Sequence, residues 1–309
     1  DVDAAGKMLV NEHASGHEVF EAHQVIDNWR AVHAFPLNTF QMYLREKARS
    51  VDKTALVAQR IKRLTSIEQK LRRMPRLKLS EMQDIGGCRA IVSSVAQVEE
   101  LVKIYKNSAL KHKPIDEDDY ILTPRNSGYR SHHLIYSYYS DKKATYNGRK
   151  IEVQLRSRLQ HAWATAVETV GTFTKQSLKS SQGERDWLRF FELMGTVIAL
   201  KEDTSPVPNT PTTSAELLRE LGDCATSLQV EARLSTYGSA LKTLETQQDK
   251  RMHFYLLALD PSAQTVTVNG YRWSQVDIAL KEYTEKEQQI RNRPGGEAVL
   301  VSVDSVAAL

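Results

Sequence analysis

The segment "GCRAIVSSVAQVEELVKIYKNSAL", residues 87–110, joins a short apolar run to a longer amphipathic one. "GCRAIVSS" predicts a buried strand, and "VAQVEELVKIYKNSAL" predicts a helix because its apolar residues recur at helical spacing. Further on, "HHLIYSYYS" and "KIEVQLR" predict two strands around the turn "YNGRK", and a helix is expected from about Arg158 to Ser177. Strand, helix, several strands and a final helix together predict a mixed α/β sheet flanked by helices.

Helices are predicted before this segment. In "SGHEVFEAHQVIDNWRAVHA", Ser15 and Glu18 have the spacing of a capping box. After the break expected at Pro36, "LNTFQMYLREKARS" begins a second helix. A third is predicted from Lys53 to Met74, where apolar residues recur at helical spacing. The polar stretch "KHKPIDEDD" is predicted to be a loop.

The part after the predicted sheet is expected to contain a linker and a smaller domain. A helix in "ERDWLRFFELMGTVIALKE" closes a main domain of residues 1–202, and the Pro- and Thr-rich stretch 203–213 is the predicted linker. Residues 214–309 then predict an α/β accessory domain. It would consist of one long helix, a strand, an Asn-Gly hairpin, a strand, a helix and a strand.

Composition restricts the class of protein. Of 309 residues, 41% are hydrophobic and 26% charged, as in folded globular proteins, and the net charge of +4 allows an anionic partner. Cys88 and Cys224 are expected to be buried thiols in a reducing compartment. No apolar run approaches the roughly 18 residues of a membrane span, and no signal peptide pattern opens the chain. We therefore expect a cytoplasmic protein without a membrane partner.

Several nucleotide and metal signatures are absent. The sequence contains no GxxxxGK[ST] loop, no GxGxxG after a strand, no HExxH and no CxxC. Polar residues nevertheless line one face of a predicted strand. In "KIEVQLR" the alternation puts Glu152, Gln154 and Arg156 on the face opposite the apolar residues. This row fits either a site or the solvated face of a half-exposed strand.

Two further patterns could contact phosphate or metal. Lys62, Ser66 and Lys70 fall on one stripe of the predicted helix 53–74, which fits either polyphosphate binding or a solvated basic face. Asp84 stands just before a predicted strand, where Asp usually forms a turn. If Asp84 meets Glu152, the two carboxylates could hold Mg²⁺ together with substrate phosphates.

The segment "YILTPRNSGYRSHH", residues 120–133, carries more hydrogen-bonding and stacking groups than a plain connection needs. Together with its neighbours it resembles the synthetase domain of the RelA/SpoT family. The matching motifs are "RIK", "SIEQK", "QDIGGCRAIV", "DYILTPRNSGYRSHH" and "IEVQLRS", in family order over roughly residues 60–170. Arg125 stands where the family has Lys, and Ser127 where it has Asn. No counterpart of the hydrolase domain of long members is expected.

The resemblance implies a nucleotidyltransferase-like synthetase fold and pyrophosphate transfer from ATP to the 3′-hydroxyl of GTP or GDP. Asp84 and Glu152 would be catalytic and would hold Mg²⁺, with Glu152 also accepting the proton of the hydroxyl. Tyr129 would stack on the guanine. The implied nucleotide-binding residues are Arg60, Lys62, Ser66, Lys70, Arg89, Arg125, Tyr129, Ser131, His133, Gln154, Arg156 and His161. The acidic "DEDDY", residues 116–120, favours GTP over GDP, or is simply a solvated loop.

Two other functions stay open. Some small members of the family transfer pyrophosphate to the 3′-CCA end of tRNA, and Lys175, Lys179, Arg185 and Arg189 would suit the phosphates of an acceptor stem. Alternatively, the chain is a degenerate synthetase that binds nucleotide and regulates through residues 214–309. The long C-terminal helix could mediate a homo-oligomer, restrain the active site or neutralise a toxic core.

Overall fold

The computed structural model describes residues 1–174, 178, 183–246, 251–260, 265–290 and 297–302. Its contacts divide the chain into two compact units. The first comprises Asp1–Thr123 and Arg130–His161, and the second comprises Pro124–Tyr129 and Ala162–Leu309. Residues 203–213 lie inside the second unit, where the buried Val207 donates its N–H to Thr196 Oγ1 at 3.0 Å. The contacts thus divide the chain elsewhere than at this segment, and the domain assignment stays a prediction.

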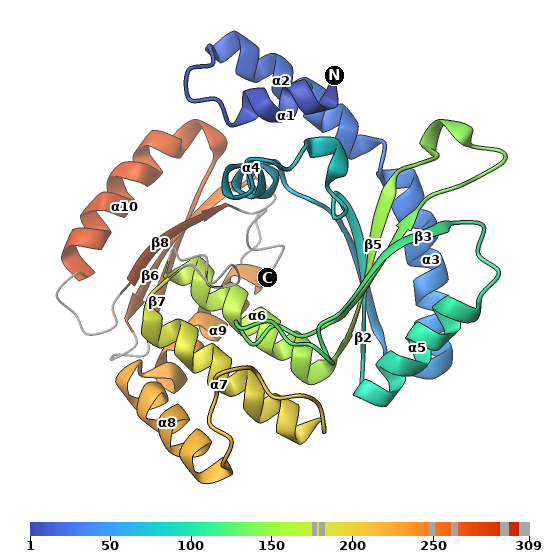
Figure 1. Cartoon of the computed structure of the whole chain (residues 1–309). Helices are drawn as coiled ribbons and strands as arrows, with labels where there is room; N and C mark the ends of the chain where they lie inside the picture. Colours follow the sequence, from blue (N-terminus) through green and yellow to red (C-terminus); the bar gives the residue numbers. More distant parts are fainter. Residues whose placement is uncertain (175–177, 179–182, 247–250, 261–264, 291–296, 303–309) are drawn as a thin grey trace. The chain divides into compact units, whose positions relative to one another are not determined.

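A five-stranded mixed sheet forms the centre of the first unit (Figure 1). Its strand order is β1-β2-β5-β4-β3, with β2 and β5 parallel and the other pairs antiparallel. The strands are β1 (Leu56–Ile61), β2 (Gly86–Val92), β3 (Lys113–Asp119), β4 (His132–Ser137) and β5 (Lys150–Ser157). The strands predicted in "GCRAIVSS", "HHLIYSYYS" and "KIEVQLR" are confirmed, as is the mixed α/β class.

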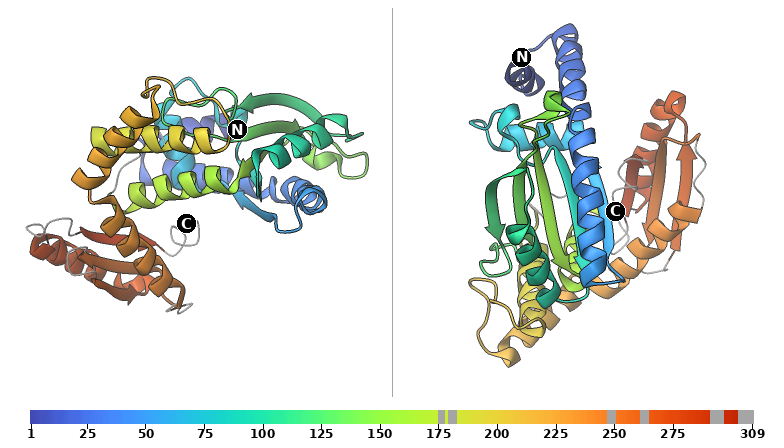
Figure 2. Two further views of the ribbon diagram at one scale, coloured as in Figure 1. Left: turned by 90° about the horizontal axis from the view of Figure 1, so that it is seen from below. Right: turned by 90° about the vertical axis from the view of Figure 1, so that its right-hand side faces the viewer.

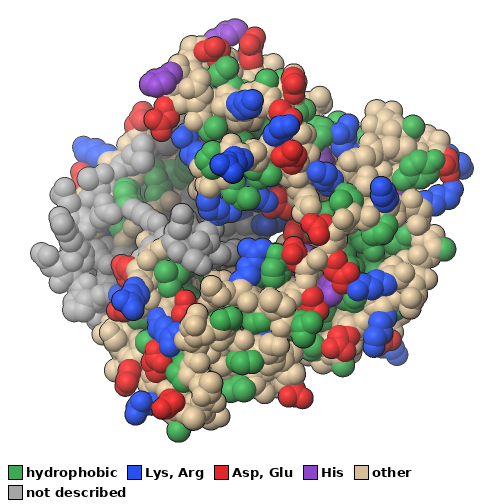
Figure 3. Space-filling model, in the orientation of Figure 1, with side chains coloured by type: hydrophobic (Ala, Val, Ile, Leu, Met, Phe, Trp, Pro, Cys, Tyr) green, Lys and Arg blue, Asp and Glu red, His purple; other side chains and the backbone are tan. Residues whose placement is uncertain are grey.

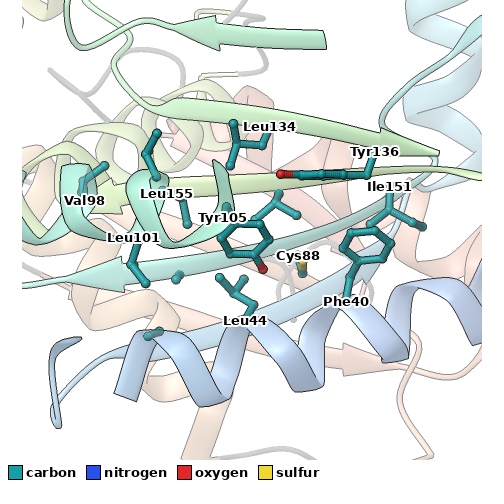
Figure 4. Packing of buried hydrophobic residues seen from close by; sticks show 14 of the residues in the cluster. Phe40, Leu44, Cys88, Val98, Leu101, Tyr105, Leu134, Tyr136, Ile151 and Leu155 are labelled. Carbon is teal, nitrogen blue, oxygen red and sulfur yellow. The ribbon is translucent and has the colours of Figure 1, made fainter. Parts of the chain in front are cut away.

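Helices α3 (Ala34–Val51) and α5 (Val95–Asn107) cover one face of this sheet (Figure 2). Phe40 and Leu44 of α3 pack with Leu101 of α5 against the sheet in a buried cluster (Figure 4). From β5, Ile151, Val153 and Leu155 enter this core and are completely buried. Because strand residues alternate, Glu152, Gln154 and Arg156 point to the other face, as predicted.

A second core lies among the N-terminal helices of the first unit. It joins α1 (Val2–Leu9), α2 (Gly16–Ala31), α4 (Leu64–Arg73) and the 3₁₀ turn η1 (Leu79–Glu81). The predicted capping box is present at the start of α2, where Glu18 N–H donates to Ser15 Oγ at 3.3 Å and Ser15 N–H to Glu18 Oε2 at 2.8 Å.

The second unit is mainly helical, with a small antiparallel sheet of order β7-β6-β8. Helix α6 (Arg158–Phe173) enters it from the first unit. The other elements are α7 (Arg185–Lys201), α8 (Ser214–Ser227), α9 (Val230–Thr246), β6 (Phe254–Asp260), β7 (Thr265–Tyr271), α10 (Val276–Ile290) and β8 (Glu297–Ser302). None of the helices within the described ranges has the length and apolar character needed to cross a bilayer.

The predicted helix from Lys53 to Met74 is wrong in its first half. Residues 56–61 form edge strand β1, paired with β2 from Leu56↔Ile91 to Ile61↔Gly86, and the helix begins at Leu64. Val57 and Ile61 are four residues apart, and an even separation also puts two side chains on one face of a strand. Both pack against the main core, so the same spacing served a strand.

Other boundaries differ for local reasons. The expected loop 111–119 contains β3, an edge strand that needs only one partner. Pro36 lies in the first turn of α3, where its missing N–H costs nothing. The long helix expected from residue 214 breaks into α8 and α9 near Gln229, whose φ is 50°. The Asn-Gly hairpin expected at Asn269-Gly270 is absent, because both residues lie within β7.

Some predicted segments fall partly outside the described residues. These are 247–250, 261–264 and, at the expected end of α6, 175–177.

Candidate active site

Polar side chains from three adjacent strands share the sheet face opposite the main core. Gln154 of β5 lies between Arg89 of β2 and His133 of β4 in the strand register. One step along β5, Glu152 lies between Gly87 and Ile135. Gly87 has no side chain, so β2 leaves space beside the Glu152 carboxylate. We call this surface the polar face.

Asp84 is held by two lysines that come from different elements. Its Oδ2 accepts from Lys62 Nζ at 2.8 Å and its Oδ1 from Lys70 Nζ at 2.9 Å. Lys62 lies in the link between β1 and α4, where its N–H donates to Ile85 O at 2.8 Å, and Lys70 lies on α4. Burial raises the pKa of Asp84, but the two ammonium groups lower it more, so the pKa lies well below its usual value. Asp84 is therefore ionised, and each of its two carboxylate oxygens is held by a lysine.

Glu152 is a buried carboxylate with two hydrogen-bonding neighbours. Its Oε1 lies 3.0 Å from His133 Nδ1, and its Oε2 accepts from Gln154 Nε2 at 2.7 Å. Burial raises its pKa and so does the charge of Asp84, whereas His133 and Gln154 lower it. The net shift is downward, so the side chain is held as a carboxylate, the form that binds a cation or accepts a proton.

Gln154 connects this carboxylate to two cations. Its Oε1 accepts from Arg89 Nε and from Arg156 Nη2, each at 3.1 Å. Arg156 is only 1% exposed. With its amide donating to Glu152 and its carbonyl accepting from two arginines, Gln154 is oriented by three groups. The resemblance implies that Gln154 binds nucleotide, and the structure adds a hydrogen bond from its amide to the Glu152 carboxylate.

The other nucleotide-binding residues predicted in the first unit lie on several different elements. Arg60 is opposite Gly87 in the register of β1 and β2, and Ser66 is on α4. Ser131 is completely buried, and its hydroxyl donates to Leu155 O at 3.2 Å, so its visible contact is with the sheet. His161 lies on α6, at the end of the first unit.

Arg125 and Tyr129 belong to the second unit. The Arg125 guanidinium lies 6.0 Å from the centre of the Tyr129 ring, and the Trp163 ring packs edge-on at 6.3 Å. Tyr129 is 6% exposed. A base that stacks on this ring would therefore have to displace a neighbour.

The donor set near Asp84 and Glu152 suits a hard cation. Carboxylate oxygens are the ligands that Mg²⁺ prefers, usually one or two of them with substrate phosphates. The ammonium groups of Lys62 and Lys70 already contact both oxygens of Asp84. Within the described ranges, no group of three or more His, Cys, Asp or Glu side chains could hold a metal. The two carboxylates fit Mg²⁺ only if a lysine gives up its place and phosphates supply the other ligands.

Positive charge gathers near this site and is neutralised elsewhere. Figure 3 shows Lys and Arg side chains over α4, which carries Lys70, Arg72 and Arg73. Of the basic residues suggested for an acceptor stem, Arg189 pairs with Glu220 at 2.6 Å and with Glu192 at 3.2 Å. Arg185 is exposed, and Lys175 and Lys179 lie outside the described residues. The contacts of Arg189 reduce its value for binding nucleic acid.

Sequence reasoning missed one neighbour of the site. The Tyr120 ring packs edge-on against His133, with centroids 5.2 Å apart. It supports the imidazole that contacts Glu152. Tyr120 is the first residue of the segment 120–133, but the pattern predicts no separate role for its ring, because the stretch before it is predicted to be a loop.

A known family model matches the part of the chain that contains these motifs. Residues 59–176 match the family model described as the region found in RelA / SpoT proteins. The chain is 34% identical over 114 residues to the GTP pyrophosphokinase YjbM of Bacillus subtilis (strain 168), covering 35% of this chain and 52% of that protein. It is 30% identical over 119 residues to a GTP pyrophosphokinase of Haemophilus influenzae, covering 38% of this chain and 14% of that protein.

Solved structures of similar proteins include small alarmone synthetase 2 from Bacillus subtilis. It is 21% identical, with a TM-score of 0.48, over 57% of this chain and 94% of that one. Small alarmone synthetase 1 from the same organism, bound to its product pppGpp, is 19% identical with a TM-score of 0.48, over 57% and 93%. The chain spans about half the length of the Bacillus relative YjbM and 14% of the Haemophilus one.

Proposed function

Because residues 59–176 carry a RelA/SpoT region, we propose that this chain transfers pyrophosphate from ATP to the 3′-hydroxyl of GTP or GDP, making (p)ppGpp and releasing AMP. The observation that carries the proposal is the pair of neighbouring carboxylates, each held by at least one partner from another motif. Lys62 and Lys70 hold Asp84, and His133 and Gln154 hold Glu152. Motifs far apart in the sequence thus supply the groups that this reaction requires.

The residues divide the chemistry between them. The oxygen of the 3′-hydroxyl attacks the β-phosphorus of ATP, the bond from that phosphorus to the α-phosphate oxygen breaks, and AMP leaves. Glu152 accepts the hydroxyl proton, because it is ionised and its orientation is fixed by His133 and Gln154. Mg²⁺ held by Asp84 and Glu152 would neutralise charge on the phosphates. Arg89 and Arg156 stabilise negative charge on the transferred group.

On the acceptor side, Tyr129 would receive the guanine and Arg125 a phosphate. The acidic segment 116–120 supports GTP rather than GDP. The partners of that segment are set by β3, where Glu117 contacts Lys106 at 2.7 Å and His132 at 2.8 Å.

The test is an assay of the purified chain with ATP, Mg²⁺ and one acceptor at a time, namely GTP, GDP or tRNA. We expect equal amounts of AMP and of a 3′-pyrophosphorylated guanosine nucleotide. Glu152→Gln is expected to abolish transfer while ATP still binds. As the control, Glu282→Gln changes a paired carboxylate of the second unit, which accepts from the Tyr271 hydroxyl at 2.6 Å, and should keep activity.

A product formed only on tRNA would replace the proposed acceptor. Absence of any product from the folded protein would contradict the proposal as a whole and favour a regulator that only binds nucleotide.

A further inference from the structure

The segment Pro124–Tyr129 is packed against α7 through its glycine. Gly128 has φ 89°, a conformation that L side chains rarely adopt. A Cβ on Gly128 would lie 2.7 Å from Phe191 O of α7 and 3.0 Å from the Trp163 ring of α6. Gly128 is therefore required by the neighbouring helices as well as by its backbone angle.

A second glycine meets it from the side of α7. Gly195 lies one turn after Phe191, so both face the segment. A Cβ on Gly195 would lie 2.9 Å from Gly128 Cα and 3.1 Å from Gly128 O. Trp163 of α6 also binds α7 at this contact, because its Nε1 donates to Phe191 O at 2.9 Å. Two backbones thus touch where a methyl group does not fit.

The segment is short and internally bonded, so a displacement at Gly128 would reach its functional residues. Gly128 N–H donates to Arg125 O at 2.9 Å, and Arg125 N–H donates to Tyr129 O at 3.4 Å. Helix α7 cannot easily move back, because Trp187 and Leu193 are completely buried and Arg189 is bonded to Glu220 of α8. A group inserted between α7 and Gly128 would therefore displace the segment that contains Arg125 and Tyr129.

We infer that Gly195 is a positioning residue for the acceptor, because it lets α7 approach the 124–129 segment and so sets where Tyr129 and Arg125 are held. The inference rests on the proposed function for the role of these two residues. Helix α7 (Arg185–Lys201) lies beyond residues 59–176, so the family match does not include it. The acceptor site thus depends on an element outside the matched region.

The experiment compares Gly195→Ala with two changes of the same kind in other helices. Gly222 on α8 and Gly238 on α9 have no atoms within 4 Å of the position of an added Cβ. For Gly195→Ala we expect KM for GTP or GDP to rise roughly 10-fold, since misplacement by about 1 Å can cost up to about 100-fold. KM for ATP and kcat should change much less. Amide hydrogen exchange of residues 125–129 should become faster in the protein without ligand.

Gly222→Ala and Gly238→Ala should leave all these values as in the unchanged chain. Trp163→Phe keeps an aromatic ring but removes the donor to Phe191 O, and it should shift acceptor KM and exchange in the same direction by less. If Gly195→Ala does not fold, Trp163→Phe tests the inference by the same two measurements. Unaltered acceptor KM and exchange in the folded variants would overturn the inference, as would an equal rise in both KM values.

The two proposals fail in different ways. If the unchanged chain transfers pyrophosphate to no acceptor, the proposed function fails. Faster exchange of residues 125–129 in Gly195→Ala, with Gly222→Ala unchanged, would still support the contact between α7 and the segment. Normal exchange in Gly195→Ala would overturn the contact whatever the activity.

Discussion

Opposing effects meet at the Glu152 side chain. Burial and the charge of Asp84 favour the neutral acid, whereas His133 and Gln154 favour the carboxylate, and the second pair prevails. A proton acceptor must be ionised in the free enzyme, so its pKa sets the acid limb of the pH dependence of kcat/KM. His133 is therefore the residue through which the ionisation of Glu152 can be tested.

Replacing His133 by Phe should raise the pKa of Glu152, because burial and Asp84 remain while a stabilising neighbour is lost. The acid limb of kcat/KM for pyrophosphate transfer should then move to higher pH. At neutral pH the rate should fall about 10- to 100-fold, as is usual when a partner that orients a reacting group is removed. The measurement is a pH profile with GTP as acceptor.

His133→Asn keeps a donor to the Glu152 carboxylate and should recover part of the shift. Tyr120→Phe is the matched control, because it keeps the ring that packs against His133. An acid limb that stays in place in His133→Phe would show that Glu152 is not the group whose ionisation limits the reaction.

The sequence predicts candidate site residues, but it does not predict the contacts between them. The sequence pattern suggests that Asp84 and Glu152 meet, and in the structure the charge of Asp84 acts on Glu152. Lys62 and Lys70 were expected on one helical stripe, yet only Lys70 is helical. They converge because the link after β1 is bonded to Ile85, beside Asp84. Such a long-range contact leaves no periodic signal in the sequence.

Among the elements, buried strands and amphipathic helices were predictable and edge strands were not. Strands β2 and β5 have neighbours on both sides and apolar residues directed into the core, so their patterns were clear. Strands β1 and β3 have one partner each and exposed, charged residues. Their pairing depends on backbone hydrogen bonds that every sequence can make. This is why the sequence pattern predicts a helix at β1 and a loop at β3.

Helix α1 is joined to the segment that leads to Asp84. Asp3 accepts from Ser80 N–H at 2.8 Å and from Ser80 Oγ at 2.9 Å, and Gly6 lies so close that a Cβ would be 2.8 Å from Leu79 Cβ. The Ser80 N–H bond is the main cause of the lowered pKa of Asp3. The charged form of Asp3 therefore contributes to the attachment of α1.

Asp3→Asn should lower the free energy of unfolding at pH 7 by about 1 kcal/mol, the usual net value of such hydrogen bonds. The folded-state pKa lies below the unfolded value of about 3.9, so the contribution is present above that pH and is lost as the pH falls through the folded pKa. The difference between the two proteins should shrink below about pH 4. Urea unfolding at several pH values measures it.

The exposed Glu12 gives a control. Its carboxylate is 3.7 Å from Arg72, with 81% of the side chain exposed, so Glu12→Gln should change stability by less than about 0.5 kcal/mol. A loss in Asp3→Asn that does not vary with pH would contradict the electrostatic account of this contact.

At the scale of the whole molecule, each compact unit contains one cysteine, and neither is in a disulfide. Cys88 of β2 is 2% exposed, and burial, with the charge of Glu152, raises its pKa well above the usual value. Cys224 of α8 is partly exposed, and burial raises its pKa as well. The thiolate is the reactive form, so the two thiols differ in both access and ionisation.

We expect a thiol reagent such as DTNB to modify Cys224 in the folded protein at a rate that rises with pH. Cys88 should react only when the core of the first unit opens, because its sulfur packs among the residues behind the sheet. The experiment follows absorbance with time for the unchanged chain, Cys88→Ser and Cys224→Ser, at increasing urea.

The urea dependence of the slow phase of the reaction, which is assigned to Cys88, gives the opening free energy of the first unit. This value is compared with the free energy of global unfolding measured by circular dichroism. An opening free energy below the global value means that the first unit opens on its own, and equality means that both units unfold together. Equal, rapid reaction of both thiols without urea would contradict the buried position of Cys88.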